Sequence, residues 1–323
     1  MKLTSFLGKT LKKSFSKREV LFEDKQTDCF RLFNSEADGI DGLTIDLYGQ
    51  YLLVQYFRPN LLEDLNLFLE IIVNLSSFFS FKIKGVLLKN RSPLKGNLDF
   101  QTLRKSKLIL GETPPQGYNV KQNGLKIEVD LIEGQNTGLF LDMREIRNEL
   151  AKFYHSYPIK SLLNLFCYTG VFSVQALKNS VRQVLNVDLS KSVLNRAKKN
   201  YKINSLSVDD RDFIYGDALD WLKRFQKKEE KFSLAIIDPP TFARNRKKTF
   251  SVKKDYARSL LLLEKIVKPG FVLSSINSKT VSEQDYKNYH PYNWQLVFFK
   301  NESSDFRYLR EPYLKVGLWE INN

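Results

Sequence analysis

The stretch Ser161-Leu-Leu-Asn-Leu-Phe-Cys-Tyr-Thr-Gly-Val171 joins a short apolar run to a tight turn. It predicts a strand over 161–166, followed by a helix over 171–177. The same rhythm continues downstream, with strands expected at 184–187, 212–215, 234–237 and 271–274, and helices at 191–201, 219–225 and 256–267. This alternation predicts an α/β fold with a doubly wound, Rossmann-like parallel sheet, whose ligand lies at the carboxyl ends of the strands.

The first half of the chain has a different pattern. Strands are expected at 30–33, 43–47, 51–57 and 85–89, an amphipathic helix at 61–75, and a hairpin over 120–131 that turns at Asn123-Gly124. We therefore divide the chain into a basic N-terminal arm (1–20), a small α+β domain (21–134) expected to bind the substrate, and the doubly wound domain (135–323).

Charge and composition limit the kinds of molecule that the protein is expected to bind. The 323 residues carry 51 Lys and Arg against 36 Asp and Glu, a net charge of +15 that favours nucleic acid, although a solvated lysine-rich surface gives the same count. The two cysteines, Cys29 and Cys167, and the two histidines, His155 and His290, are too few for a disulfide framework or a Cys/His metal centre. The low cysteine count fits a reducing cytoplasm, and we expect a monomer or homodimer without metal. No secretory signal or transmembrane span is visible, so no membrane contact is expected.

The turn after the first doubly wound strand has one glycine, Gly170, where a dinucleotide fingerprint has three. A pyrophosphate needs several close backbone N–H groups, whereas S-adenosylmethionine has no phosphate, so the turn favours S-adenosylmethionine over NAD. Asp188 ends the next strand, where a carboxylate can accept the ribose hydroxyls, and Asp217 in Gly216-Asp-Ala218 is placed to meet the adenine amino group. A single strand-end aspartate is often only a helix cap. Here the glycine turn, Asp188, Asp217 and Asp238-Pro-Pro-Thr-Phe242 follow four successive predicted strands in order, and together they indicate a cofactor site.

These motifs resemble those of the bacterial large-subunit ribosomal RNA methyltransferases, the family that includes the cytosine-5 enzyme RlmI and the guanine-N7 half of RlmKL. The resemblance covers about residues 28–319 and rests on Glu133-Gly-Gln-Asn-Thr-Gly-Leu-Phe-Leu-Asp-Met-Arg144, Asn164-Leu-Phe-Cys-Tyr-Thr-Gly170, Asp188-Leu-Ser190 and Asp238-Pro-Pro-Thr-Phe242, with 31–43 and 313–315. It implies an S-adenosylmethionine-dependent RNA methyltransferase. The candidate cofactor-binding residues are Phe140, Arg144, Asn164, Tyr168, Thr169, Gly170, Asp188, Leu189, Ser190, Asp217, Ala218 and Asp238.

The sequence departs from the family's cytosine-5 members. Its N-terminal arm is too short for their PUA domain, the family's double glycine is Gly170-Val171, and their Ser-Cys-Ser is replaced by Ser274-Ser-Ile-Asn-Ser278. Carbon-5 of cytosine is not nucleophilic until a Cys thiolate adds to carbon-6. Cys29 and Cys167 are expected to be small core residues, and no base is evident for a serine hydroxyl. Cytosine-5 chemistry is therefore disfavoured.

A ring or exocyclic nitrogen attacks the methyl group without covalent help, provided that the enzyme aligns the reactants and excludes water. Asp238 is the candidate acceptor for an N–H group of the base, and Pro239 and Pro240 stiffen the strand end. Phe242 is placed to stack on a base taken out of its helix or loop, and Asn277 is either a second polar contact or a loop cap. These residues form the candidate catalytic set, with guanine, at N7 or the exocyclic amine, as the favoured substrate.

A run of basic residues follows Phe242 and suits contacts with RNA phosphates, although such a run is usually only a solvated surface. The candidate RNA-binding residues are Arg244, Arg246, Lys247 and Lys248. The favoured partner is large-subunit ribosomal RNA. Three alternatives stay open: a non-catalytic RNA-binding module of the same fold, a protein or small-molecule methyltransferase, and a cytosine-5 enzyme with an atypical site.

Overall fold

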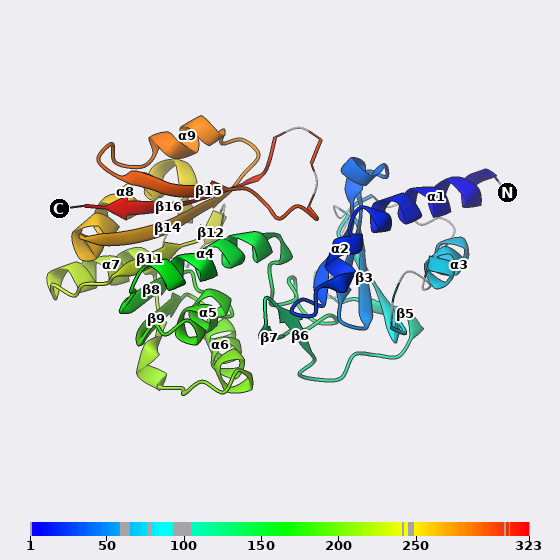
Figure 1. Cartoon of the computed structure of the whole chain (residues 1–323), viewed down its shortest axis with the longest axis horizontal. Coiled ribbons are helices and arrows are strands. Elements are labelled where there is room, and N and C mark those ends of the chain that lie inside the picture. The colour runs from blue at the N-terminus through cyan, green and yellow to red at the C-terminus, as the bar shows by residue number, and fades with distance from the viewer. Residues whose placement is uncertain are drawn as a thin grey trace. The chain divides into compact units, whose positions relative to one another are not determined.

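The computed structural model describes residues 2–58, 65–75, 79, 81–92, 105–240, 242–244, 249–306, 308–309 and 311–322 (Figure 1). The chain forms two compact units. Unit 1 comprises Met1–Arg144 and Ser303–Arg310, and unit 2 comprises Glu145–Glu302 and Glu311–Asn323. The division falls after the boundary expected at residue 134, and a short segment from the second half of the chain joins unit 1.

Within the described residues, unit 2 is built on a seven-stranded sheet. Its strands are β8 (Ser161–Leu165), β9 (Gln183–Asp188), β10 (Phe213–Tyr215), β11 (Leu234–Ile237), β14 (Gly270–Asn277), β15 (Gln295–Lys300) and β16 (Leu314–Ile321). They lie in the order β10-β9-β8-β11-β14-β16-β15, in which the first five strands are parallel and the last two antiparallel. The predicted doubly wound, Rossmann-like sheet is confirmed, and β16 and β15 extend it at one side.

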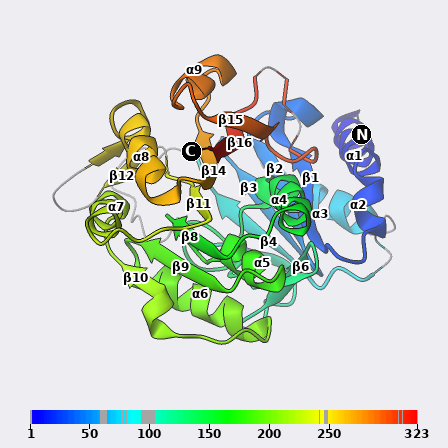
Figure 2. The same ribbon diagram turned by 60° about the vertical axis from the view of Figure 1, so that its left-hand side comes forward.

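Helices cover both faces of this sheet. They are α4 (Arg144–Ser156), α5 (Val171–Lys178), α6 (Lys191–Ile203), the short 3-10 helix η5 (Asp210–Asp212), α7 (Ala218–Lys227), α8 (Val252–Val267) and α9 (Glu283–Asn288). Because successive strand residues point to opposite faces, β8 separates two layers. Leu163 and Leu165 enter the core formed with α7 and α8, whereas the Asn164 side chain contacts Ser173 of α5 on the other face. Figure 2 shows α5 and α6 on one side of the sheet and α7 and α8 on the other.

The spacing of apolar residues explains this packing. In α8, Tyr256, Leu260 and Leu263 are fully buried, and their separation by three or four residues places them on one side of the helix. The central strands carry apolar side chains on both faces, because a parallel sheet is covered on both sides by its connecting helices. The same pattern made the strands recognisable in the sequence.

Unit 1 contains a five-stranded mixed sheet among its described residues. In order across the sheet, the strands are β1 (Cys29–Asn34), β2 (Leu43–Tyr48), β3 (Tyr51–Tyr56), β4 (Gly85–Asn90) and β5 (Lys107–Gly111). β3 and β4 run parallel, with α3 (Leu65–Asn74) in the connection between them. The helix was expected over 61–75, of which 61–64 lie outside the described residues. β5 is not among the expected strands, because it is an edge strand with largely exposed side chains.

The N-terminal segment is part of unit 1's core and not a separate arm. It forms α1 (Lys2–Ser16) and α2 (Glu19–Glu23). Leu11 and Phe15 of α1 are fully buried in one cluster with residues of the sheet. The helix docks because apolar side chains four residues apart lie on one side of it.

Short elements complete the two units. The predicted hairpin is formed by β6 (Asn119–Gln122) and β7 (Leu125–Glu128), and both turn residues, Asn123 and Gly124, have positive φ. Unit 1 also holds the 3-10 turns η1 (Ser35–Asp38) and η4 (Leu141–Met143). Unit 2 also holds the strands β12 (Phe242–Arg244) and β13 (Thr249–Ser251).

Candidate active site

The five parallel strands of unit 2 all end at one edge of the sheet. The chain moves from β8 to β9 on one side and later returns to β11 on the other, so the strand order reverses at β8. Ligands of open α/β sheets bind at such a switch point. The structure brings to this edge the loop 166–170, Asp188, Asp217 and Asp238.

The loop after β8 requires a glycine at its last position. Phe166 and Tyr168 have φ of 55° and 51°, and Gly170 has φ of 71°. The Gly170 N–H donates to the Cys167 carbonyl oxygen at 2.9 Å and closes the turn. A Cβ on Gly170 would lie 3.0 Å from the Cβ of Ala197 in α6. Both the backbone conformation and the close approach of α6 disfavour a larger residue.

A buried polar network supports this loop. The Asn164 amide donates to Ser173 Oγ at 2.7 Å, and the Ser173 hydroxyl donates to Asn186 Oδ1 at 2.7 Å. The Thr169 carbonyl oxygen accepts from the Asn200 amide at 2.8 Å. Asn164 and Thr169 are both buried, so each stabilises the loop from within, and their contact with a cofactor stays a prediction.

Asp188 ends β9 with capacity for further hydrogen bonds. Its Oδ2 accepts the Tyr168 N–H at 3.0 Å, and its Oδ1 accepts the Ser190 N–H at 2.9 Å. The Leu189 N–H also interacts with this carboxylate. A carboxylate has about four acceptor positions, so capacity is left for a ribose hydroxyl. Burial raises the pKa of Asp188, and the backbone N–H groups oppose that rise. Leu189 and Ser190 are half-buried, and Ser190 Oγ caps α6 by accepting the Val193 N–H.

Asp217 is the N-cap of α7, the structural role that the sequence left open. Its Oδ1 accepts the N–H groups of Leu219 at 3.0 Å and Asp220 at 3.2 Å. Both capping bonds go to Oδ1 and neither goes to Oδ2. Oδ2 can therefore accept a hydrogen bond from an adenine amino group. Ala218 is buried in the core, so any contact with a cofactor would come from its backbone.

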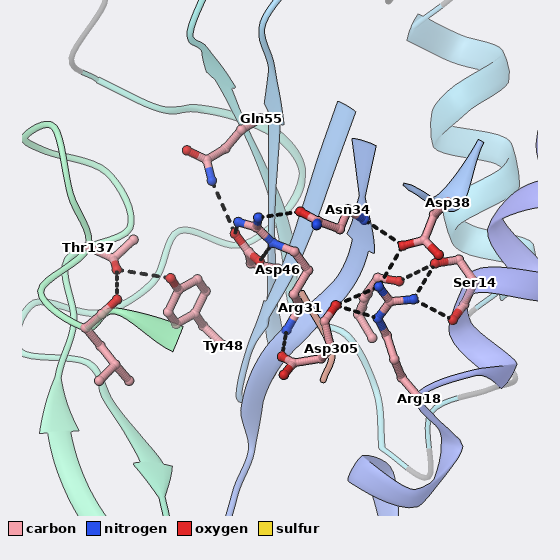
Figure 3. Close-up of polar contacts among 12 residues, drawn as sticks. Ser14, Arg18, Arg31, Asn34, Asp38, Asp46, Tyr48, Gln55, Thr137 and Asp305 are labelled. Atoms are coloured by element: carbon pink, nitrogen blue, oxygen red, sulfur yellow. Dashed lines mark hydrogen bonds and ion pairs between the residues drawn. The ribbon is translucent and has the colours of Figure 1, made fainter. Parts of the chain in front are cut away.

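Phe140 and Arg144, two further expected cofactor contacts, belong to unit 1. Phe140 is 41% exposed. Arg144 is buried, and its Nη2 lies 3.0 Å from Oδ1 of Asp305. The other oxygen of that carboxylate, Oδ2, accepts the Arg31 N–H at 2.8 Å (Figure 3). Sequence reasoning missed Asp305, because it lies 161 positions from Arg144 and only the fold brings the two together. The cofactor contacts of Phe140 and Arg144 stay predictions.

Asp238 follows β11 and is held by the neighbouring strand. Ile237 lies opposite Ser274 of β14, and the next residue, Ser275, donates a hydrogen bond from its hydroxyl to Asp238 Oδ1. Asp238 is half-buried, Pro239 is buried and Pro240 is exposed. The hydroxyl orients the carboxylate, and the proline rings restrict the backbone after it. The sequence showed Ser275 only as part of an unusual motif and did not reveal this contact.

The serine before it does have a base, contrary to the expectation from the sequence. Ser274 Oγ lies 2.7 Å from His290 Nε2, and His290 Nδ1 lies 2.9 Å from the Tyr286 carbonyl oxygen. A carbonyl only accepts, so we assign the proton to Nδ1, and Nε2 accepts from Ser274. Burial lowers the pKa of His290 to about 4. Because Ser274 is fully buried, the pair stabilises β14 and does not present a nucleophile.

The segment after Asp238 is only partly described. β12 and β13 pair antiparallel, so Arg244 lies in a strand and not in the expected basic loop. For Phe242 and Arg244 only the backbone is described, so their predicted side-chain roles stay predictions. Arg246, Lys247 and Lys248 lie outside the described residues. Asn277 is the exposed last residue of β14.

Among the described residues, no group of three or more His, Cys, Asp or Glu side chains is placed to hold a metal ion. No described helix has both the length and the apolar character needed to cross a membrane.

Known proteins are similar to this chain in both sequence and fold. A family model of S-adenosylmethionine-dependent methyltransferases matches residues 37–288. YwbD of Bacillus subtilis, provisionally described as a ribosomal RNA large subunit methyltransferase, is 33% identical over 287 residues, 88% of this chain and 69% of YwbD. The ribosomal RNA large subunit methyltransferase I of Photobacterium profundum is 31% identical over 269 residues, 83% of this chain and 65% of that protein. The chain thus spans about two thirds of the length of these relatives.

A solved structure extends the likeness. SMU.776, provisionally described as a methyltransferase and solved in complex with SAH, has a TM-score of 0.87 and 26% sequence identity, and the match covers 98% of this chain and 82% of that one. The glycine turn and the strand-end carboxylates of unit 2 suit the same cofactor class. The chain therefore belongs to the S-adenosylmethionine-dependent methyltransferases.

Proposed function

We propose that this methyltransferase modifies a base of large-subunit ribosomal RNA and that the acceptor atom is a guanine nitrogen. The RNA substrate is supported by the net charge of +15 and by relatives that are named as ribosomal RNA methyltransferases. The nitrogen acceptor rests on one observation, the burial of both cysteines.

A cytosine-5 enzyme needs a thiolate that adds to carbon-6 of the base. Cys167 is buried, and burial raises the pKa of its thiol well above the usual range, with a further rise from the Asp188 carboxylate. Cys29 is fully buried in unit 1, where its Sγ lies 3.3 Å from the Lys121 carbonyl oxygen. Neither thiol is available as a nucleophile, so a nitrogen acceptor is the simpler chemistry.

The residues at the sheet edge can align such an acceptor. S-adenosylmethionine supplies an electrophilic methyl group when bound, and Asp188 and Asp217 would hold its ribose and adenine. Asp238 accepts an N–H of the guanine, and the Ser275 hydroxyl fixes the direction of that carboxylate. Transfer to N7 releases no proton, whereas transfer to the exocyclic amine releases one, for which Asp238 is the acceptor.

Nucleoside analysis tests the proposal. The purified protein is incubated with labelled S-adenosylmethionine and ribosomal RNA from cells that lack its gene, and the RNA is then digested to nucleosides. The expected product is a methylguanosine from the large subunit. Label in 5-methylcytidine would refute the nitrogen acceptor, and label only in protein would refute the RNA substrate.

A further inference from the structure

α1 has one face in the core and one face in solvent. At 100° per residue, Leu7, Leu11 and Phe15 lie on the side that packs into unit 1. The opposite side carries only basic, polar and aromatic residues, and the helix contains no acidic residue. We call this side the lysine face and define it by Phe6, Lys9, Lys12 and Lys13, together with Lys17 in the turn that follows the helix.

Polar contacts hold the helix and the turn after it against unit 1. The Ser14 hydroxyl donates to the Leu32 carbonyl oxygen at 2.7 Å. The Arg18 guanidinium donates to Asp38 Oδ2 at 2.6 Å and to the Asp305 carbonyl oxygen at 2.7 Å (Figure 3). These buried bonds, added to the apolar contacts, fix which side of α1 faces solvent. The lysine face is therefore a fixed array and not a fluctuating tail.

Ion pairs neutralise part of the charge of this face. Lys17 lies 3.4 Å from Asp38, a carboxylate that Arg18 already neutralises. Lys9 and Lys13 form no ion pair with a carboxylate among the described residues. Their ammonium groups are strongly hydrated point charges of the kind that contact phosphates. Phe6, 61% exposed, lies one turn before Lys9, where an aromatic ring can stack on a base.

We propose that the lysine face of α1 is a docking surface for the phosphate backbone of RNA. This inference rests on the proposed function, in which RNA is the substrate. The helix is not suited to a membrane surface, because such helices insert their apolar face into the lipid. In α1 the apolar face, formed by Leu11 and Phe15, is already buried in the core of unit 1. Phosphate contacts carry little sequence information, so the face would contribute affinity and position, while Asp238 and its surroundings select the base.

A charge-neutralising triple variant tests the surface. Lys9→Gln, Lys12→Gln and Lys13→Gln are combined, since glutamine keeps the helix propensity of lysine. The matched control combines Lys178→Gln, Lys202→Gln and Lys227→Gln, exposed lysines in the last turns of α5, α6 and α7, which lie at the opposite edge of the sheet from the candidate site. Both triples change the net charge equally.

The probe is large-subunit ribosomal RNA transcribed in vitro, bound at a series of KCl concentrations. Each lost phosphate contact lowers the slope of log affinity against log salt by about 0.7 to 0.9, so the α1 triple should lower it by about 2 to 3 and weaken binding more than tenfold at low salt. The control triple should keep the wild-type slope.

The outcomes separate the two proposals. An unchanged slope in the α1 triple refutes the docking surface, even if the wild type methylates the RNA. A lysine-dependent slope without methyl transfer supports the surface and refutes the proposed function. Loss of binding to phosphatidylglycerol vesicles, with RNA binding intact, would overturn the surface in favour of a membrane contact.

Discussion

Acidification should destabilise unit 2 through His290. The ring lies beneath β14, where Nε2 accepts from the Ser274 hydroxyl and the ring stacks on Trp319 with centroids 4.0 Å apart. Burial lowers the pKa of His290 from 6.5 to about 4, because the imidazolium would lose its hydration there. The unfolded chain is therefore protonated first. The contribution of His290 to stability is complete above pH 6.5 and falls as the pH drops toward 4.

The size of this effect follows from the pKa difference. At about 1.4 kcal/mol for each pKa unit, the drop from 6.5 to about 4 corresponds to roughly 3 kcal/mol of unfolding free energy. Other buried groups act in the opposite direction. Burial raises the pKa of Asp188, so protonation of that carboxylate favours the folded state as the pH falls. The contribution of His290 must therefore be separated from theirs.

Urea unfolding of the wild type and His290→Gln makes this separation. All three tryptophans, Trp221, Trp294 and Trp319, lie in unit 2, so their fluorescence reports its unfolding. Between pH 7 and pH 4 the wild type should lose about 3 kcal/mol more than the variant. Parallel stability curves for the two proteins across this range would refute the assignment of a neutral, buried His290.

Two further substitutions separate binding from transfer at the sheet edge. Asp238→Ala should abolish methyl transfer in the labelled assay while S-adenosylmethionine still binds in calorimetry. Ser275→Ala should lower kcat by about five- to tenfold, the value of one hydrogen bond. Full activity of Asp238→Ala would contradict its catalytic assignment. Gly170→Ala should weaken cofactor binding about tenfold, since a left-handed conformation costs a non-glycine residue about 1–2 kcal/mol and its Cβ would meet Ala197. Gly8→Ala, which meets no atom within 4 Å, is the control, and equal affinity of the two variants would contradict the role of the turn.

The core of the fold could be predicted because its signals are local. The apolar runs of β8 and β11 and the helices that follow each strand repeat with a clear period, and a parallel sheet buried on both faces produces that pattern. β5 has no such signal, since it is an exposed edge strand defined by its pairing with β4. β15 and β16 join the sheet as antiparallel strands outside the alternation of strands and helices, so that alternation does not predict them.

Some residues of the candidate site could be predicted from local sequence, whereas contacts between distant residues could not. The places of Asp188, Asp217 and Asp238 follow from their distance after each strand, which is a local feature. Ser275 is 37 positions from its partner Asp238, and His290 is 16 positions from Ser274. No spacing rule in the sequence reveals such contacts, because the pairing of β11 with β14 and the packing of α9 create them.

Calorimetric titration of S-adenosylmethionine into the wild type and Asp188→Ala tests most directly whether the carboxyl edge of unit 2 is the cofactor site. Asp188 should accept two ribose hydroxyls, and a hydrogen bond to a charged group is worth about 1.5–3 kcal/mol. The wild type should bind one equivalent, and Asp188→Ala should bind at least about 100-fold more weakly. Equal affinity of the two proteins would contradict the assignment of Asp188 and, with it, the location of the site.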